Sequence, residues 1–338
     1  MDPVDRLILD ESPEPDGPVL VVDAPELATA ASARGWAVWG YADSLLLEQR
    51  FDVPMIDRWP GDADGGAPDA DIELILLRLP KAVAALEEYA QRFALLPRDV
   101  RLVAGGRVKH MTHAMNEALA TRFGTVRASL GRQKSRVLHA ADPIPGPLDF
   151  PRTAQHPELD LTLAAHGATF AGTRIDPGTR LLTTVLDRLP ASDPHTPAVD
   201  LGSGNGTLSV LLARAGHRVL ALDESRAACA STAASARLNG VEVDVERADG
   251  LTGRPDGSSG LIVCNPPFHV GTAKDSTPAL AMIDDAARVL RPGGELWLVF
   301  NAHLPYLPRL RQRIGRTEIV ARNPKFIVSR SVRGARLA

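Results

Sequence analysis

Short apolar segments alternate with helix-like segments along the second half of the chain. Strands are predicted at 198–201, 218–223, 241–245, 260–264 and 295–300. Helices are predicted at 208–215, 227–239 and 278–290, and glycines follow the first two. The segments 317–321 and 325–329 flank Asn323-Pro324 and predict a hairpin. This alternation favours an α/β domain with a doubly wound, mostly parallel sheet that an antiparallel hairpin closes.

The first half of the chain follows the same plan. Apolar strands are expected at 18–23, 37–44, 72–80 and 99–105, with a helix at 27–33 that Gly35 ends. The segments 37–44 and 219–225 both end in an aspartate followed closely by a serine. We interpret the two halves as an internal duplication, although any two α/β domains share part of this pattern.

A proline-rich segment separates the halves. Pro143, Pro145, Pro147 and Pro151 remove backbone donors and restrict φ, so the segment predicts a semi-rigid connector. The expected organisation is a first domain at 1–141, a linker at 142–158 and a second domain at 159–338. The polar residues 60–71 indicate a surface loop.

Composition predicts a soluble cytoplasmic protein with substantial cores. The 338 residues are 44% hydrophobic, and no stretch is apolar enough to span a membrane. The N-terminus has no signal-peptide pattern. Only two cysteines occur, which argues against a disulfide framework or a cysteine-based zinc site. His110 and His113 have no other ligand nearby in sequence, so we expect no metal.

The net charge of −3, taken alone, argues against a nucleic-acid partner. It is an average over the chain, however, and can hide an uneven distribution of charge. Residues 98–139, which include Arg98, carry nine basic and two acidic side chains, and residues 303–338 carry nine basic and one acidic. Such clusters can neutralise RNA phosphates, although solvated surface arginines would give the same count. The candidate RNA-contacting residues are Lys109, Arg132, Lys134, Arg136 and Lys325.

A glycine-rich turn follows the strand at 198–201. Its sequence is Asp200-Leu201-Gly202-Ser203-Gly204-Asn205-Gly206-Thr207. The spacing does not match a nicotinamide fingerprint, and no Gly-Lys-Ser/Thr follows as in a P-loop. The acidic Asp200 suits a ligand with a positive amino group and disfavours a phosphate. The candidate cofactor-binding residues here are Asp200, Gly202, Ser203, Gly204, Asn205 and Gly206.

Two further aspartates follow the next two strands. Asp223 stands where ribose hydroxyls are usually bound, and Asp249 can accept a hydrogen bond from an adenine amine. An amino group, a ribose and an adenine without a pyrophosphate describe S-adenosylmethionine. The set resembles the class I methyltransferases. In the first half, Asp23 is followed by Ala24-Pro25-Glu26 without a glycine, so we expect no cofactor there.

The fourth strand of the second half ends in Asn265-Pro266-Pro267-Phe268. The exocyclic amine of a base is a poor nucleophile, because its lone pair is delocalised into the ring. The Asn265 side-chain oxygen and the Pro266 carbonyl can accept its two N–H bonds and turn the lone pair outward. Pro266 and Pro267 would stiffen the loop, Phe268 would stack on an extruded base, and Asn265 would also border the cofactor. This motif resembles that of methyltransferases acting on planar nitrogen.

Several motifs together resemble the ribosomal RNA guanine-N2 methyltransferases. They are Asn265–His269, Phe170–Leu182, Asn301–Tyr306 and Asn323–Phe326. Arg78–Lys81 and Ala104–Thr112 are similar to the large-subunit (23S) branch. Ser203 departs from a frequent cysteine and Pro324 from a more usual lysine.

The resemblance implies two tandem Rossmann-like class I methyltransferase domains, the first inactive and holding RNA, the second catalytic. It implies N2-methylation of an unpaired or flipped guanine in ribosomal RNA by a chain expected to be monomeric. Alternatives remain open at this point. They are a 16S rRNA guanine-N2 enzyme, a methyltransferase of another planar nitrogen (protein glutamine, DNA or RNA adenine), and a non-catalytic RNA-binding protein.

Overall fold

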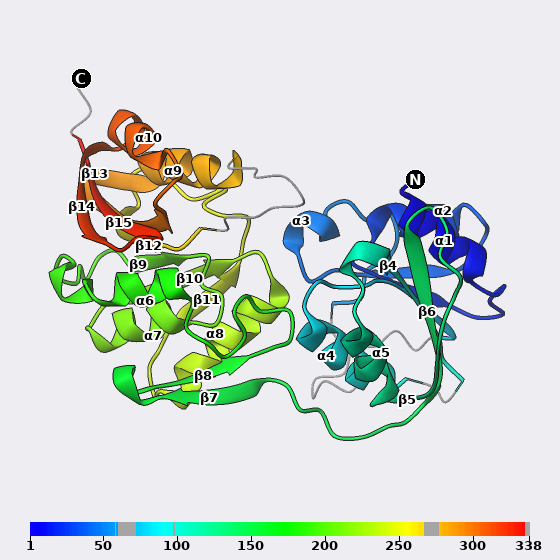
Figure 1. The fold of residues 1–338 in the computed structure, drawn as a ribbon. Coiled ribbons are helices and arrows are strands. Elements are labelled where there is room, and N and C mark those ends of the chain that lie inside the picture. The colour runs from blue at the N-terminus through cyan, green and yellow to red at the C-terminus, as the bar shows by residue number, and fades with distance from the viewer. Residues whose placement is uncertain (58, 60–71, 97–98, 267–276, 335–338) are drawn as a thin grey trace. The chain divides into compact units, whose positions relative to one another are not determined.

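The computed structural model describes residues 1–57, 59, 72–96, 99–266 and 277–334. The chain forms two compact units (Figure 1). Unit 1 comprises Met1–Phe150 with His166–Ala168, and unit 2 comprises Pro151–Ala165 with Thr169–Ala338. Within unit 1, the Glu88 carboxylate accepts hydrogen bonds from the His166 ring and the Gly167 N–H, both at 2.7 Å.

Unit 1 is built on a six-stranded sheet of order β2-β1-β3-β4-β6-β5. Its strands are β1 (Val19–Val22), β2 (Val38–Tyr41), β3 (Leu74–Arg78), β4 (Arg101–Arg107), β5 (Phe123–Ala128) and β6 (Ser135–Pro143). Its helices are α1 (Pro3–Glu11), α2 (Pro25–Ser32), α3 (Leu45–Glu48), α4 (Val83–Phe93), α5 (His113–Ala120) and the 3₁₀ turn η1 (Val108–His110). β1 to β4 are parallel, whereas β6 is antiparallel to both β4 and β5.

Unit 2 is built on a seven-stranded sheet of order β11-β10-β9-β12-β13-β15-β14. Its strands are β9 (Ala198–Leu201), β10 (Val219–Asp223), β11 (Asp244–Arg247), β12 (Ser259–Cys264), β13 (Leu290–Asn301), β14 (Gly315–Arg322) and β15 (Phe326–Arg333). Its helices are α6 (Pro177–Thr183), α7 (Thr207–Arg214), α8 (Arg226–Leu238), α9 (Thr277–Val289), α10 (Tyr306–Arg313) and the 3₁₀ turns η2 (Pro157–Leu159) and η3 (Leu186–Arg188). The hairpin expected at the end of the chain is confirmed by the antiparallel pairing of β14 with β15.

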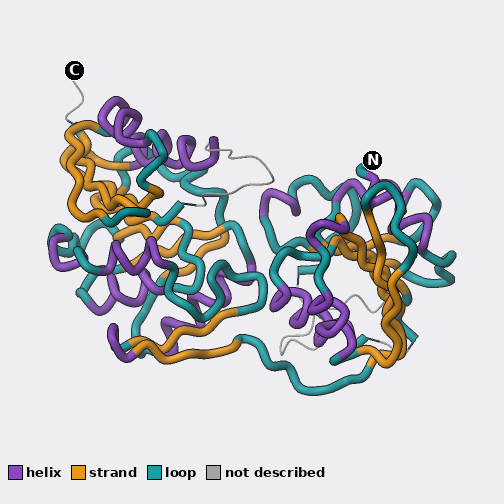
Figure 2. The backbone as a smooth tube through the Cα atoms, viewed as in Figure 1, coloured by secondary structure: helices purple, strands orange, loops and turns teal. Residues whose placement is uncertain are grey.

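Helices cover both faces of each sheet (Figure 2), because alternate strand residues point to opposite sides. In unit 1, Leu20 and Val22 join one buried cluster with α4, while Val19 and Val21 join another with α1 and α2. In unit 2, the two faces of the sheet likewise contribute to separate clusters. The two-sided burial explains why these strands have continuous apolar sequences.

The two sheets share one strand order. Without β11, the order β10-β9-β12-β13-β15-β14 repeats β2-β1-β3-β4-β6-β5, with the same parallel and antiparallel pairs. The sequence predicted the closing antiparallel pair only for the second half. β5 and β6 were not recognised, because polar residues interrupt their apolar pattern. The shared order supports the duplication that the sequence suggested.

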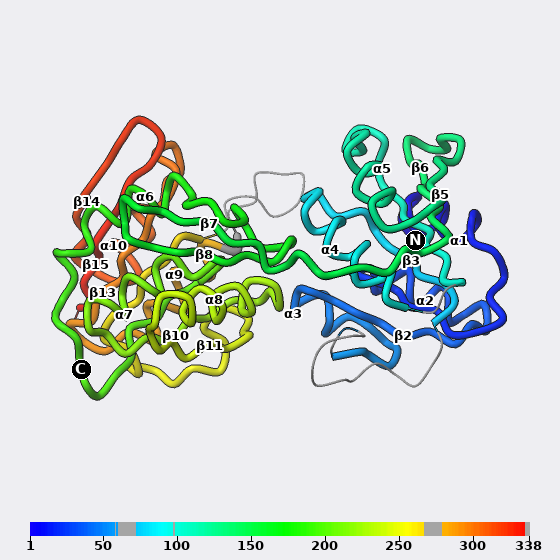
Figure 3. The backbone as a smooth tube through the Cα atoms, turned by 90° about the horizontal axis from the view of Figure 1, so that it is seen from below, coloured from blue at the N-terminus to red at the C-terminus, as the bar shows by residue number. Residues whose placement is uncertain are grey.

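The segment 142–158, expected to be a linker, contains a strand. β7 (Arg152–His156) pairs antiparallel with β8 (Leu161–Ala165) in a separate two-stranded sheet. Figure 3 follows the chain from β6 through the proline-rich residues into β7. No proline interrupts residues 152–156, so their backbone donors are available to the buried β8. In the described part of the chain, no helix is long and apolar enough to cross a membrane.

Candidate active site

The glycine-rich turn connects β9 to α7 at the carboxyl edge of the unit 2 sheet. Gly202, Gly204 and Gly206 have φ angles of 79°, 55° and 81°, which L side chains rarely adopt. A Cβ on Gly206 would lie 2.9 Å from the Thr232 Cα, so a larger residue has no room there. The turn therefore requires glycine at these positions, and its backbone stays open to a ligand.

Asp200 lies beneath this turn and is fully buried. Its Oδ2 accepts a 2.5 Å hydrogen bond from Ser209, while Oδ1 has no partner among the described residues. Burial raises the pKa of the Asp200 carboxyl to about 7, opposed by the Ser209 hydrogen bond and assisted by the nearby Asp223 charge. A buried acceptor without a partner is costly. The residues that line the pocket at this turn do not include Asp200, so its contact with the amino group of a ligand stays a prediction.

Asp223 and Asp249 follow neighbouring parallel strands. Asp223 ends β10 and accepts hydrogen bonds from the N–H groups of Gly204 and Ser225, both at 3.0 Å. Its register partner in β11 is Arg247, two residues before the exposed Asp249. Both aspartates therefore lie at the carboxyl edge of the sheet, as the sequence predicted for the two halves of a nucleoside site.

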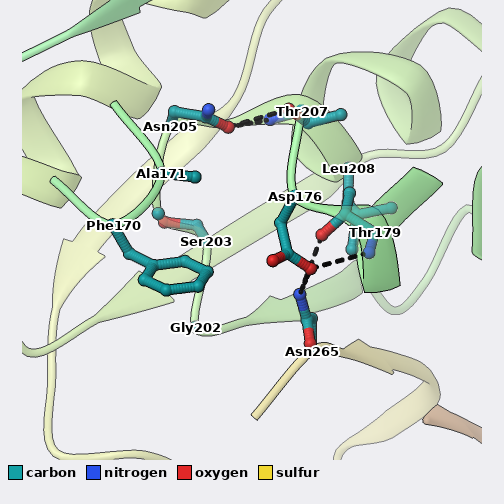
Figure 4. Close-up of a pocket in the computed structure, with 11 residues that line it drawn as sticks. Phe170, Ala171, Asp176, Thr179, Gly202, Ser203, Asn205, Thr207, Leu208 and Asn265 are labelled. Atoms are coloured by element: carbon teal, nitrogen blue, oxygen red, sulfur yellow. Dashed lines mark hydrogen bonds between the residues drawn. The ribbon is translucent and has the colours of Figure 1, made fainter. Parts of the chain in front are cut away.

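Asn265 follows β12 at the same edge. Its Nδ2 donates to Asp176 Oδ2 at 3.0 Å and to Thr179 Oγ1 at 2.9 Å (Figure 4). A carboxylate accepts only, so these bonds assign the amide orientation. Asn265 Oδ1 is left without a partner among the described residues. It is therefore available to accept a hydrogen bond from a substrate.

Asp176 was not recognised as a site residue from the sequence. It caps the N-terminus of α6, where Oδ2 accepts from the N–H groups of Gly178 at 2.7 Å and Thr179 at 3.2 Å. The sequence Asp176-Pro177 is a helix-start signal, and it lies in the segment quoted for the family resemblance. The capping signal alone does not reveal that the same oxygen also holds Asn265.

Asn205 and Ser203 are already engaged by the protein. The Asn205 amide donates to the carbonyls of Gly172 and Arg174, and its oxygen accepts from Thr207. The Ser203 hydroxyl accepts from Thr232 at 3.0 Å. Asn205 thereby holds the glycine turn against the segment before α6, and Ser203 holds it against α8. Their contribution to cofactor binding stays a prediction. We expect them to act by shaping the turn and presenting its backbone, because their side chains already bond within the protein.

A pocket joins these elements. Figure 4 shows the Phe170 ring on one side of the glycine turn and Asn265 with Asp176 on the other. Phe170 is 68% exposed. It begins a segment quoted for the family resemblance, but the sequence analysis gave it no role in the site. The lining residues are Phe170, Ala171, Asp176, Thr179, Gly202, Ser203, Gly204, Asn205, Thr207, Leu208 and Asn265. Pro266 is buried just behind Asn265, while Pro267 and Phe268 lie outside the described residues.

The equivalent edge of unit 1 has different residues. By strand register, Asp23 stands where Gly202 does, and Arg78 stands where Asn265 does. Asp23 adopts a φ of 54° and accepts hydrogen bonds from the Asp43 N–H and the Tyr89 hydroxyl. Arg78 is paired with Asp5, which is buried, and with Asp2. Arg78 is thus neutralised by two aspartates, and Asp23 is held by hydrogen bonds, so these two positions provide neither the glycine nor the asparagine of unit 2.

Ion pairs reduce the free positive charge that the sequence suggested. Arg132 pairs with Glu11 at 3.0 Å, and Arg313 pairs with Asp284 at 2.9 Å. Lys109, Lys134, Arg136 and Lys325 are exposed, and none has an ion pair with another described residue. Arg98 and Arg336 lie outside the described residues. Within the described part, no group of three or more His, Cys, Asp or Glu side chains is placed to hold a metal.

Two family profiles match the chain. The methyltransferase small domain matches residues 160–330, and the RLMG N-terminal domain matches residues 64–143. The chain is 37% identical to the ribosomal RNA large subunit methyltransferase G of Streptomyces coelicolor over 79% of this chain and 73% of that one. It is 34% identical to the protein of the same name from Aeromonas hydrophila, over 96% of this chain and 90% of that one.

The fold resembles a solved structure as well. A 16S rRNA N2 methyltransferase (RsmC) of T. thermophilus, in complex with AdoMet and guanosine, aligns with 98% of this chain and 92% of its own. The TM-score is 0.78 at 23% sequence identity, which supports the tandem class I methyltransferase fold. The sequence relationship is more specific, because the curated relatives match both halves of the chain. The chain belongs to the ribosomal RNA large subunit methyltransferase G family.

Proposed function

We propose that this protein transfers a methyl group from S-adenosylmethionine to the exocyclic N2 of a guanine in large-subunit ribosomal RNA. The observation that carries the proposal is the orientation of Asn265. Its amide nitrogen is held by Asp176 and Thr179, while its oxygen has no hydrogen-bond partner among the described residues. Membership of the large subunit methyltransferase G family supports ribosomal RNA as the substrate.

The residues of unit 2 fit this cofactor. The open glycine turn lets a ligand approach the backbone closely. Asp200, whose Oδ1 has no hydrogen-bond partner among the described residues, is the proposed acceptor for the amino group. Asp223 and Asp249 are the acceptors for ribose hydroxyls and for the adenine amine. Bound S-adenosylmethionine supplies an electrophilic methyl group on a sulfonium centre. No metal is required for this chemistry.

Asn265 would act on the guanine amine. Its Oδ1 accepts one N–H, and the Pro266 carbonyl accepts the second, which draws the nitrogen away from planarity and makes its lone pair available. Because Asp176 and Thr179 already orient the amide, little reorganisation is needed when the base arrives. The proton is lost from the methylated nitrogen to water, so no strong general base is required.

Unit 1 would hold the RNA through its exposed cations, and Lys325 would contact RNA in unit 2. The guanine must be unpaired or flipped, because its N2 is engaged in a duplex. Phe268 would then stack on the extruded base. We further propose that the protein acts as a monomer in the cytoplasm, since a single chain contains both a platform and an active site.

Nucleoside mass spectrometry tests this function. We would compare 23S and 16S rRNA from cells with the gene, without it, and complemented by either the wild type or Asn265→Ala. N2-methylguanosine should fall by one residue per 23S molecule without the gene, and only the wild type should restore it. Loss confined to 16S rRNA would overturn the choice of subunit. Unchanged N2-methylguanosine with loss of another methylated product would overturn the substrate itself.

A further inference from the structure

The turn between β5 and β6, residues 129–134, has an exposed leucine at the surface of unit 1. Leu130 is 87% exposed, more than the other exposed large hydrophobic residues of the described chain. It lies between Ser129 and Gly131, where no hydrophobic cluster of the unit includes it. A single exposed leucine needs no explanation by itself, so the surrounding turn decides whether it has a role.

The backbone of this turn is held in a strained shape. Arg132 and Ser135 exchange N–H···O bonds of 2.9 and 2.8 Å around Gln133 and Lys134. Both central residues have positive φ, 49° and 58°, in a turn that usually selects Asn and Gly. The Ser129 hydroxyl accepts a further hydrogen bond from the Val137 N–H. Strain that the surrounding structure maintains is typical of functional surface turns.

The turn lies at the edge of the sheet where ligands bind in α/β domains. Ser135, the first residue of β6, pairs with Arg107, the last residue of β4. The turn therefore stands beside the carboxyl ends of the parallel strands of unit 1. The Val108 N–H donates to the Lys134 carbonyl at 3.0 Å, which brings η1 directly against the turn.

Three exposed cations lie on this turn or on the elements that adjoin it. Lys109 of η1, Lys134 of the turn and Arg136 of β6 have no ion pair with any described residue. Arg132 and Arg107, by contrast, are neutralised by Glu11 and Asp2. Three positive charges without an ion pair among the described residues, on the same turn and its neighbours as one exposed apolar side chain, complement a nucleic acid whose bases are accessible next to its phosphates.

We propose that the β5–β6 turn is an RNA wedge, in which Leu130 packs against an unstacked base while Lys109, Lys134 and Arg136 bind the flanking phosphates. This inference rests on the proposed RNA substrate and adds a structural preference to it. A wedge needs a loop, bulge or helix end, because a continuous A-form duplex offers no base face to an apolar side chain. The turn would thereby direct unit 1 to irregular RNA.

The test compares two RNA probes with four protein variants. The probes are a short stem–loop with one 2-aminopurine in the loop and a fully paired duplex of equal length. The variants are the wild type, Leu130→Ala, Lys134→Ala and, as a matched control, Leu46→Ala, which shortens an exposed leucine of α3. Thermal melting of each variant verifies that it is folded.

The wild type should bind the stem–loop about tenfold more tightly than the duplex and raise the 2-aminopurine fluorescence, since burying one leucine provides that much. Leu130→Ala should lose the preference and the fluorescence rise but keep the salt dependence of binding. Lys134→Ala should lower the salt slope by about one. Leu46→Ala should behave as the wild type.

Equal stem–loop binding by the wild type and Leu130→Ala would overturn the wedge. Reduced activity of Leu130→Ala on ribosomal particles with unchanged binding to the stem–loop would also overturn it, in favour of a protein contact. Neither result touches the proposed function, which the comparison of methylated nucleosides from cells with and without the gene tests separately.

Discussion

Units 1 and 2 share the order and direction of six strands, yet the residues that follow equivalent strands differ in kind. In unit 2, a glycine turn follows β9 and Asn265 follows β12. Oδ1 of Asp200 and Oδ1 of Asn265 are buried there without a hydrogen-bond partner among the described residues. In unit 1, Asp23 and Arg78 take the equivalent positions. Asp23 accepts a hydrogen bond from Tyr89, and Arg78 forms ion pairs with Asp2 and Asp5. The strand framework is thus compatible with either an open ligand edge or a closed one. The loops decide which function each unit retains.

We expect the largest loss of turnover for Asn265→Ala, which removes the acceptor that distinguishes unit 2 from unit 1. Removing the oriented acceptor should lower kcat by about 10²-fold, the usual cost of losing one preorganised polar group. S-Adenosylmethionine affinity should change little, because the other proposed cofactor contacts remain. Single-turnover methylation and equilibrium binding measure the two quantities. A mutant that turns over at the wild-type rate would remove Asn265 from the mechanism.

Asp176→Ala should have the next largest effect on turnover. It releases the Asn265 amide, so we expect kcat to fall about tenfold through misorientation. It also removes the α6 cap, which should cost about 1 kcal/mol of unfolding free energy. Asp176→Asn, which retains one acceptor oxygen, should rescue stability better than turnover. If Asp176→Asn restores kcat as fully as it restores the free energy of unfolding, Asp176 has only a structural role.

Asp200→Asn separates charge from shape through its pH dependence. Cofactor affinity should fall about tenfold at pH 8, because a charge-assisted hydrogen bond is lost. The difference should narrow below the pKa of about 7, where the wild-type carboxyl is itself protonated. Binding titrations from pH 6 to 8 measure this convergence. A difference that is constant over this range would contradict an ionised Asp200 as the partner of the amino group.

Asp200→Asn should weaken cofactor binding at high pH, but it should make the folded protein more stable relative to the wild type at high pH. Folding raises the pKa of Asp200 from 3.8 to about 7, so the folded state holds the proton more tightly than the unfolded state. The wild type should therefore lose stability relative to Asp200→Asn as the pH rises from about 4 to 7, and the difference should level off above 7. Melting temperatures of both proteins across this range give the measurement. A parallel pH dependence in the two proteins would be inconsistent with the buried carboxyl.

The smallest effect concerns the cations of unit 1. Lys109→Glu should weaken RNA binding and reduce its salt slope, whereas Arg132→Glu should weaken binding less, since Glu11 already neutralises Arg132. Filter binding of 23S rRNA over a range of salt concentrations compares them. Equal RNA affinity of Lys109→Glu and the wild type would argue against unit 1 as the RNA platform.

The sequence predicted the parallel core and much of the site, because these depend on local patterns. Buried strands have continuous apolar runs, and the glycines of 202–206 are required by backbone conformation. It did not reveal β5 and β6, whose polar faces hide the strand period, nor β7 within the proline-rich segment. The link from Asp176 to Asn265 spans 89 positions and depends on tertiary structure, so no local pattern contains it.

The sequence also overstated the positive charge that the basic segments leave unpaired. The basic segments were identified correctly as segments, but pairs such as Arg132 with Glu11 and Arg330 with Glu318 neutralise part of them. Glu11 lies outside the first basic segment, and Glu295, which also pairs with Arg330, lies outside the second, so only the folded chain brings these partners together. What remains exposed and unpaired among the described cations is a smaller set, which includes Lys109, Lys134 and Arg136.

Of the two copies of the fold, we expect only unit 2 to retain the cofactor site. Calorimetric titration with S-adenosylmethionine tests it most directly, using the wild type, Asp223→Ala in unit 2 and Asp23→Asn in unit 1. The account predicts one site per chain, with affinity lost or strongly weakened in Asp223→Ala and unchanged in Asp23→Asn. Two sites per chain, or loss of binding in Asp23→Asn with the fold intact, would contradict it.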